Sequence, residues 1–215
     1  MAECCDRRGH ERIFSERSAE ADARRYRGQG LDPTGRRIVD ALVARGIAGA
    51  SVLEVGGGAG ALHIELLAAG AARATNVELV PAYEPAAQEL LRERGLTDRI
   101  ERHVLDFARY GERVDPADVV VLHRVVCCYH DMPTLVSEAA RHTRRYLVLS
   151  YPTDRWWRRL DIRLENLRHR IRGVPFKAYV HDPNEIVAQA KKAGLRPLMD
   201  RSDLMWRVTL FERGS

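Results

Sequence analysis

The chain has 215 residues, 45% of them hydrophobic and 30% charged, with a formal net charge of +5. This length suits one domain that buries a core without disulfide support, and the composition excludes a disordered or membrane-embedded chain. No apolar run approaches the roughly 20 residues that span a bilayer, so we expect no integral membrane segment. Residues 1–12 are charged and lack the apolar stretch of a secretory signal, so we expect a cytoplasmic protein.

Two helices are predicted before residue 50. The first covers residues 14–27, and the second starts at Asp32-Pro33 and presents one apolar face. Beyond residue 50, strands and helices alternate. Strands are expected at 52–55, 74–79, 100–105, 118–126 and 146–151. Helices are expected at 61–69, 85–94, 133–142 and 155–172, followed by one that starts at Asp182-Pro183.

This alternation predicts an α/β fold in which helices cover both faces of a mostly parallel sheet. The last two strands, 195–200 and 205–212, have no helix between them and therefore predict an antiparallel hairpin. We thus expect a Rossmann-like, doubly wound sheet of seven strands that closes with this hairpin. Residues 1–35 would form an N-terminal helical lid and residues 36–215 the main domain, with 155–172 as a cap helix.

The most informative segment is Ser51-Val-Leu-Glu-Val-Gly-Gly-Gly-Ala-Gly60, where a strand meets a helix. Glycines allow a sharp turn and close approach of the backbone to a ligand, and the following helix offers its N-terminal N–H groups. Glu78 ends the next strand, 20 residues after Gly58, where a carboxylate can accept the hydroxyl protons of a ribose. The segment therefore predicts a nucleoside-type cofactor; a strand–helix turn without a ligand is the structural alternative.

Two cofactor classes use this geometry. From Gly56 the chain matches G-x-G-x-x-A, a pattern of dinucleotide-binding proteins. Through Glu54, Gly56, Gly58 and Gly60 it also reads E-x-G-x-G-x-G, which resembles motif I of class I S-adenosylmethionine (SAM)-dependent methyltransferases. We favour the second because Glu54 suits a zwitterionic amino acid better than a pyrophosphate, and because the sequence lacks a Tyr-x-x-x-Lys constellation. The C-terminal hairpin pattern is also one that this family shows.

The resemblance covers residues 50–215 and implies a SAM-binding methyltransferase domain. The cofactor contacts that it implies are Glu54, Gly56, Gly58, Gly60, Glu78, Leu79, Asp106, Phe107 and His123. Among them, Glu54 and Gly56 would lie near the methionine part of SAM and Glu78 at the ribose. Asp106 and Phe107 would contact the adenine, although these two residues are equally typical of a helix cap followed by a core aromatic.

A closer resemblance is to magnesium-protoporphyrin methyltransferases and related small-molecule enzymes. The shared features are an N-terminal helical cap, a fourth strand that ends in the turn Cys127-Cys128-Tyr129-His130, and an aromatic- and Arg-bearing helix after the fifth strand. The stretch 176–181 is similar too. Cys128 and His130 stand where those enzymes carry His and Pro, so we use the resemblance for architecture and methyl transfer only.

The chemistry of a sulfonium decides which residues a methyltransferase needs. Its methyl group is already activated, so the enzyme mainly aligns the acceptor and excludes water. A carboxylate or thiolate acceptor needs no base, whereas a phenol, amine or alcohol can need one. His123, Tyr129 and His130 lie near the end of the fourth strand, where open parallel sheets bind ligands. We expect His123 to border the methyl group, either histidine to be the candidate base, and Tyr129 to orient the acceptor.

The candidate substrate contacts are Tyr26, Cys128, Trp156 and Trp157. Tyr26 would reach the pocket from the lid. The two tryptophans would form a wall under the cap helix 155–172, whose seven arginines surround an apolar stripe. Alternatively, this helix lies on a membrane surface, or it is an ordinary surface helix with solvated charges.

The cysteines form two adjacent pairs, Cys4-Cys5 and Cys127-Cys128, without the spacing of a zinc site, so we expect no metal. The preferred function is methyl transfer from SAM to the O, N, S or C atom of a small molecule. The alternatives are an NAD(P)-dependent oxidoreductase and a methyltransferase fold that binds SAM without turnover. Nucleic acid is not an expected partner because the arginines are scattered and no RNA-binding module is appended. The sequence leaves the acceptor and the oligomeric state open.

Overall fold

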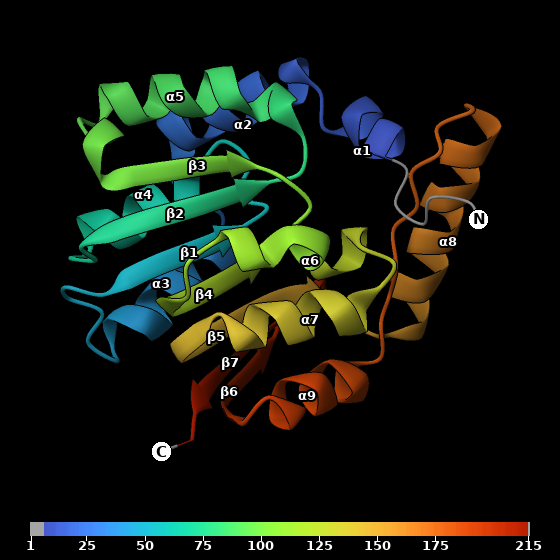
Figure 1. Cartoon of the computed structure of the whole chain (residues 1–215). Coiled ribbons are helices and arrows are strands. Elements are labelled where there is room, and N and C mark those ends of the chain that lie inside the picture. Colours follow the sequence, from blue (N-terminus) through green and yellow to red (C-terminus); the bar gives the residue numbers. More distant parts are fainter. Residues whose placement is uncertain (1–6, 215) are drawn as a thin grey trace.

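A computed structural model describes residues 7–214, which contain a seven-stranded sheet in the order β3-β2-β1-β4-β5-β7-β6 (Figure 1). The strands are β1 (Ser51–Val55), β2 (Arg73–Glu78), β3 (Ile100–Val104), β4 (Ala117–His123), β5 (Thr143–Pro152), β6 (Leu195–Ser202) and β7 (Trp206–Arg213). Strands β1 to β5 pair in parallel, whereas β7 runs antiparallel between β5 and β6. The predicted Rossmann-like sheet with its antiparallel C-terminal hairpin is confirmed.

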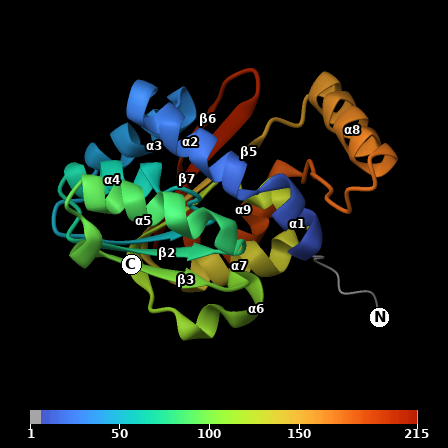
Figure 2. The same ribbon diagram turned by 90° about the horizontal axis from the view of Figure 1, so that it is seen from above.

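Helices cover both faces of this sheet (Figures 1 and 2). One face carries α3 (Pro33–Val43), α4 (Ala61–Ala68) and α5 (Glu84–Glu93). The other carries α6 (Phe107–Tyr110), α7 (Met132–Arg141) and α9 (Pro183–Lys192). Two helices precede α3, namely α1 (Arg7–Ile13) and α2 (Glu16–Gln29), and α8 (Trp156–Ile171) stands apart from the sheet at the right of Figure 1.

The central strands are buried on both faces, as parallel strands between two helix layers must be. In β4, Val119 to Leu122 are at most 1% exposed, and β1 pairs with this run from Val52 to Glu54. The N-terminal helix α2 packs against the outer side of the α4–α5 layer, where Ala19 and Ala23 share an apolar cluster with Leu90. The carboxyl ends of the parallel strands therefore lie next to the N-terminal helices.

Two features differ from the sequence-based expectation. The fourth strand ends at His123 rather than at Val126, because Arg124 adopts a left-handed backbone conformation (φ 61°) and a 3₁₀ turn, Val126–Cys128, follows it. The short helices α1 and α6 were not predicted. They contain only 7 and 4 residues, which is too short for an apolar helical period to show.

Within residues 7–214, no helix has both the length and the hydropathy needed to cross a membrane. Cys4 and Cys5 lie outside the described residues. Cys127 and Cys128 are free thiols whose Sγ atoms are 3.8 Å apart. In the same described range, no group of three His, Cys, Asp or Glu side chains has the arrangement of a metal site.

Candidate functional site

A cavity of about 410 Å³ lies at the carboxyl edge of the parallel strands. It is bordered by the glycine loop after β1, by the ends of β2, β3 and β4, and by residues of α1 and α2. This volume lies within the range of small-molecule sites. Open α/β sheets bind ligands at this edge, at the point where the strand order reverses, which here lies between β1 and β4.

The glycine loop presents bare backbone to the cavity because side chains do not fit there. Gly56 has φ 68°, and a Cβ at this residue would lie 2.5 Å from a methyl group of Val125. A Cβ at Gly57 would lie 2.2 Å from the Oδ1 atom of Asn76. Such distances are far shorter than van der Waals contact. The loop therefore requires glycine at both positions, and its backbone can approach a ligand closely.

Glu78 places a buried carboxylate beside this loop. Its Oε2 atom accepts the Gly58 N–H at 2.9 Å, and its Oε1 atom accepts the N–H groups of Leu79 and Val80 at 2.9 and 3.3 Å. Burial raises the pKa of Glu78 above the usual carboxyl value, and the three backbone hydrogen bonds and the charge of Arg102 only partly offset this. A carboxylate offers about four lone-pair sites, so Oε2 retains one for a hydroxyl donor in the cavity.

Glu54 supports the loop from beneath, with its carboxylate turned toward α4. Its side chain is 2% exposed. The Oε2 atom lies 2.6 Å from Nδ1 of His63 and accepts the His63 backbone N–H at 3.2 Å. His63 is fully buried and belongs to the first turn of α4. The pair therefore ties the end of β1 to the start of α4, on either side of the glycine loop.

Asp106 and Phe107 lie where β3 ends, and both border the cavity. Asp106 caps α6 by accepting the Ala108 N–H, and its carboxylate accepts the Tyr129 hydroxyl proton at 3.0 Å. The Phe107 ring is 3% exposed and packs in the core. These two residues are thus a helix cap and a core aromatic, and they also give this end of the cavity a carboxylate next to an apolar ring. Leu79 borders the cavity too.

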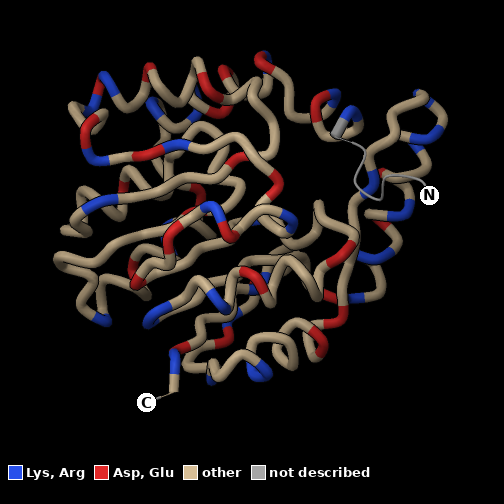
Figure 3. Tube along the Cα trace, viewed as in Figure 1, with Lys and Arg blue, Asp and Glu red and all other residues tan. Residues whose placement is uncertain are grey.

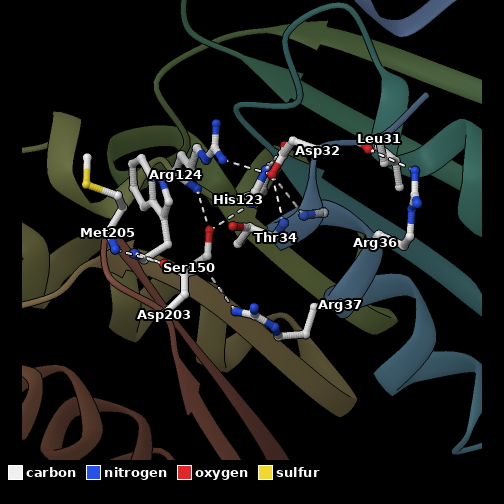
Figure 4. Close-up of polar contacts among 12 residues, drawn as sticks. Leu31, Asp32, Thr34, Arg36, Arg37, His123, Arg124, Ser150, Asp203 and Met205 are labelled. Carbon is white, nitrogen blue, oxygen red and sulfur yellow. Dashed lines mark hydrogen bonds and ion pairs between the residues drawn. The ribbon is translucent and has the colours of Figure 1, made fainter. Parts of the chain in front are cut away.

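A second polar group borders the cavity at the end of β4 (Figure 4). His123 lies 2.8 Å from Ser150 Oγ through Nδ1 and 3.2 Å from Asp32 Oδ2 through Nε2. Arg124 donates to the other oxygen of Asp32 at 2.8 Å, and its guanidinium lies 4.5 Å from the centre of the Trp206 ring. Because Asp32 is the N-cap of α3, this group joins the N-terminal helices to the sheet.

Asp32 is ionised in this group. Burial raises the pKa of Asp32, but the hydrogen bond and charge of His123, together with the charge of Arg124, bring it well below the usual carboxyl range. A neutral His123 must then donate from Nε2 to the carboxylate and accept the Ser150 hydroxyl proton at Nδ1, since Ser150 Oγ already accepts the Arg124 N–H at 2.9 Å. A protonated His123 would donate from both nitrogens. In either state, both nitrogens are engaged by side chains of this group.

Replacing Asp32 with Asn is expected to lower the free energy of unfolding by about 1–2 kcal/mol at pH 7, because Asn caps a helix as well as Asp but carries no charge for Arg124. The lowered pKa of Asp32 means that its contribution is present above the unfolded-state pKa and is lost as the pH falls toward the folded-state pKa. Urea unfolding at pH 7 and pH 3 measures this difference.

A matched control is Asp131→Asn, which alters another N-cap, that of α7, with Thr134 as its hydrogen-bond partner. The Asp32 variant should lose more stability than this control at pH 7, and its deficit should narrow at pH 3 without vanishing, because the folded-state pKa of Asp32 lies well below that pH. Equal losses in the two variants at both pH values would contradict the charged role of Asp32.

His10 of α1 borders the cavity and was missed by the sequence analysis. Its Nε2 atom lies 3.0 Å from the carbonyl oxygen of Cys128, and because a carbonyl only accepts, Nε2 carries the proton. The ring contacts Phe14 and Phe176, and Nδ1 is buried with no hydrogen-bond partner in the described chain. His10 thereby fastens α1 to the turn after β4. No motif or periodicity marks a histidine in so short a helix.

The structure brings together part of the predicted substrate set. Tyr26, Cys128 and Tyr129 border the cavity. The Tyr26 hydroxyl donates to Glu65 on α4 at 2.6 Å, so this residue also holds α2 in place. His130 does not border the cavity.

The two tryptophans were expected to form a wall of the cavity, and they do not. Trp156 is 77% exposed at the start of α8. The reason is that α8 packs through its other face, on which Arg158 and Ile162 are buried. Helix α8 therefore does not form the expected cap over the cavity.

Known proteins share this fold. A family model described as a methyltransferase domain matches residues 23–200. No curated protein matches the chain. Magnesium protoporphyrin IX methyltransferase from Synechocystis PCC 6803 with bound S-adenosylhomocysteine (SAH) has a TM-score of 0.71 and 22% identity, covering 97% of this chain and 100% of that chain. The same enzyme with bound SAM has a TM-score of 0.69 and 20% identity, covering 100% of both chains.

A third similar structure is an O-methyltransferase family protein from Burkholderia thailandensis, with a TM-score of 0.69 and 21% identity, covering 85% of this chain and 57% of that one. At such identities these structures show a common fold. The family model, in contrast, spans most of the chain, including the glycine loop, Glu78, Asp106 and the end of β4. The chain belongs to the methyltransferase-domain family.

Proposed function

We propose that this protein binds SAM in the cavity at the carboxyl edge of the sheet and transfers its methyl group to a small molecule. The observation that carries the proposal is the buried Glu78 carboxylate, fixed by the glycine loop, with a lone pair left for a ribose hydroxyl. The family match and the Synechocystis enzyme, which is described with bound SAM and SAH, support it.

The residues around the cavity fit such a cofactor. The bare backbone at Gly56 and Gly58 would accept the methionine part, and Glu78 would hold the ribose. Leu79 and Phe107 offer apolar surface to the adenine, and Asp106 offers a carboxylate to its amino group. When bound, SAM supplies a methyl group that its sulfonium already activates.

We propose further that the acceptor is a carboxylate or a thiolate, which attacks without a protein base. Both nitrogens of His123 already have protein partners, Asp32 and Ser150, so neither is turned to an acceptor in the cavity. Tyr129 donates its hydroxyl proton to Asp106, and the unpaired nitrogen of His10 is buried. The cavity side chains therefore position the acceptor and exclude water rather than remove a proton.

Replacing His123 with Gln tests this view. An amide can still donate to Asp32, so we expect kcat to fall less than tenfold, whereas loss of a general base costs about 10²- to 10⁴-fold. The rate should follow the ionisation of the acceptor with pH in both proteins. A fall of 100-fold or more, together with loss of one limb of the pH profile, would contradict the proposal. His103→Gln, which alters a partly exposed histidine paired with Glu101 outside the cavity, is the matched control.

The function itself is tested by incubating the protein with SAM and a panel of carboxylic acids, thiols, phenols and amines, and measuring SAH formation. The proposal predicts SAH formation with a member of the first two classes. Binding of SAM without SAH formation across the panel would favour a fold that binds SAM without turnover. Binding of NADH in place of SAM would favour the oxidoreductase alternative.

A further inference from the structure

Helix α8 packs its more polar face against the protein and exposes its apolar face, whereas an ordinary surface helix does the opposite. The side chains that face the body of the protein include Arg158, Ile162 and Asn166, of which the first two are buried and Asn166 bonds the backbone of Ala178. The apolar side chains instead point outward. Leu164 is two residues from Ile162, which places it about 200° around the helix. The apolar stripe of α8 therefore lies on the face opposite the packing face.

This stripe is long and exposed. Its members follow one another at spacings of three and four residues and are 47–77% exposed: Trp156, Leu160, Leu164, Leu167 and Ile171. Monomeric soluble proteins seldom expose a contiguous apolar surface of this kind unless it binds something. Since α8 stands apart from the sheet in both ribbon views, no other described element covers the stripe (Figures 1 and 2).

Arginines flank the stripe on both sides. By helical geometry, Arg163 and Arg170 lie along one border and Arg168 and Arg172 along the other. None of the four side chains has a partner in an ion pair or hydrogen bond among residues 7–214. In Figure 3, the blue of Lys and Arg recurs along α8 at the right of the view.

We propose that α8 binds an anionic lipid surface. The apolar stripe would enter the boundary between headgroups and acyl chains, and the flanking arginines would reach lipid phosphates while their stems cover apolar surface. The charges decide between lipid and a second copy of this chain. In a symmetric pairing of two α8 helices, arginine rows would face arginine rows. Only Asp161 and Glu165 could neutralise them, and Asp161 already binds Arg158.

The position of α8 in the fold determines which edge of the sheet would face a bilayer that α8 binds. The helix follows the carboxyl end of β5, and the segment after it returns to the cavity edge, where Phe176 contacts His10 and Phe14. The cavity lies at the same edge of the sheet. A chain bound through α8 would therefore hold its cavity edge toward the bilayer rather than away from it.

Cosedimentation of the full chain with vesicles tests the proposal. Vesicles of phosphatidylcholine and phosphatidylglycerol (3:1) should bind the protein at least tenfold more tightly than vesicles of phosphatidylcholine alone, and 0.5 M salt should weaken the binding. The variants Arg163→Glu/Arg170→Glu and Leu164→Glu/Leu167→Glu should each reduce binding at least tenfold. The control Arg73→Glu/Arg92→Glu makes the same charge change at exposed positions of β2 and α5, and it should bind within twofold of wild type.

A cooperative thermal unfolding transition near the wild-type melting temperature shows that the α8 variants are folded, and this readout depends on neither lipid nor SAM. Absence of binding to anionic vesicles, or equal binding by the α8 and control variants, would overturn the proposal. Sedimentation velocity gives the remaining outcome. A dimer that Leu164→Glu/Leu167→Glu dissociates, with no vesicle binding by wild type, would assign the stripe to a second copy instead.

Discussion

Replacing Glu78 with Gln is expected to weaken the binding of SAH by about 10- to 150-fold. In the proposed complex, a ribose hydroxyl donates to the remaining lone pair of a charged carboxylate, and such a hydrogen bond is worth about 1.5–3 kcal/mol, roughly twice as much as one to a neutral amide. Gln keeps the size of the side chain and one oxygen, but its amide NH2 group only donates, and both oxygens of Glu78 accept hydrogen bonds. Isothermal titration calorimetry with SAH measures the change.

The pH dependence of binding gives this prediction a second signature. Burial raises the pKa of Glu78, so the free protein loses this negative charge at a higher pH than an ordinary carboxyl group does. As the pH is lowered, wild-type affinity for SAH should therefore begin to fall at a higher pH than an ordinary carboxyl group would cause, and the Gln variant should lack that fall. The control is Glu112→Gln, at an exposed position in the 3₁₀ turn that follows α6. Unchanged affinity in Glu78→Gln would contradict the assignment of the ribose site.

Replacing Glu54 with Ala is expected to lower the free energy of unfolding by about 3–5 kcal/mol, the usual cost of removing one partner from a buried pair. His63 is fully buried and its Nδ1 lies 2.6 Å from the carboxylate. Without Glu54, this nitrogen and the His63 backbone N–H would both lose their partner beneath the glycine loop. Urea unfolding measures the loss, and SAH binding should weaken as well because the loop loses its support.

A matched exposed pair provides the control. Glu101 lies 3.0 Å from His103 on β3, with its side chain 70% exposed. An exposed pair of this kind contributes about 0–1 kcal/mol, so Glu101→Ala should change stability little. If the Glu54 and Glu101 variants lose the same small amount of stability, the pair beneath the loop does not have the role described here.

Much of the fold could be predicted from the sequence because it is encoded locally. Glycines at 56, 57, 58 and 60 mark a strand–helix turn, and apolar runs between turn signals mark the parallel strands. The missing helix between the last two strands predicts the antiparallel hairpin. The end of β4 was harder to predict, since Val125 and Val126 continue the apolar run, whereas the backbone turns at Arg124 to bond Ser150.

The candidate site was predictable where one segment supplies it and not where distant segments meet. The positions of Glu78, Asp106 and Phe107 follow from strand ends. The contacts of His123 with Asp32, 91 residues away, and of His10 with Cys128, 118 residues away, depend on how the N-terminal helices pack. For the same reason, the apolar period of α8 could be predicted, whereas the face that it buries could not.

The central claim is that the cavity beside the glycine loop binds SAM. Calorimetric titration of the purified full chain with SAM, SAH and NADH tests it most directly. The account predicts binding of SAM and of SAH with one site per chain, loss of most of this affinity in Glu78→Gln, and no heat from NADH. A titration in which wild-type protein binds neither SAM nor SAH, or binds NADH more tightly than either, would contradict the account.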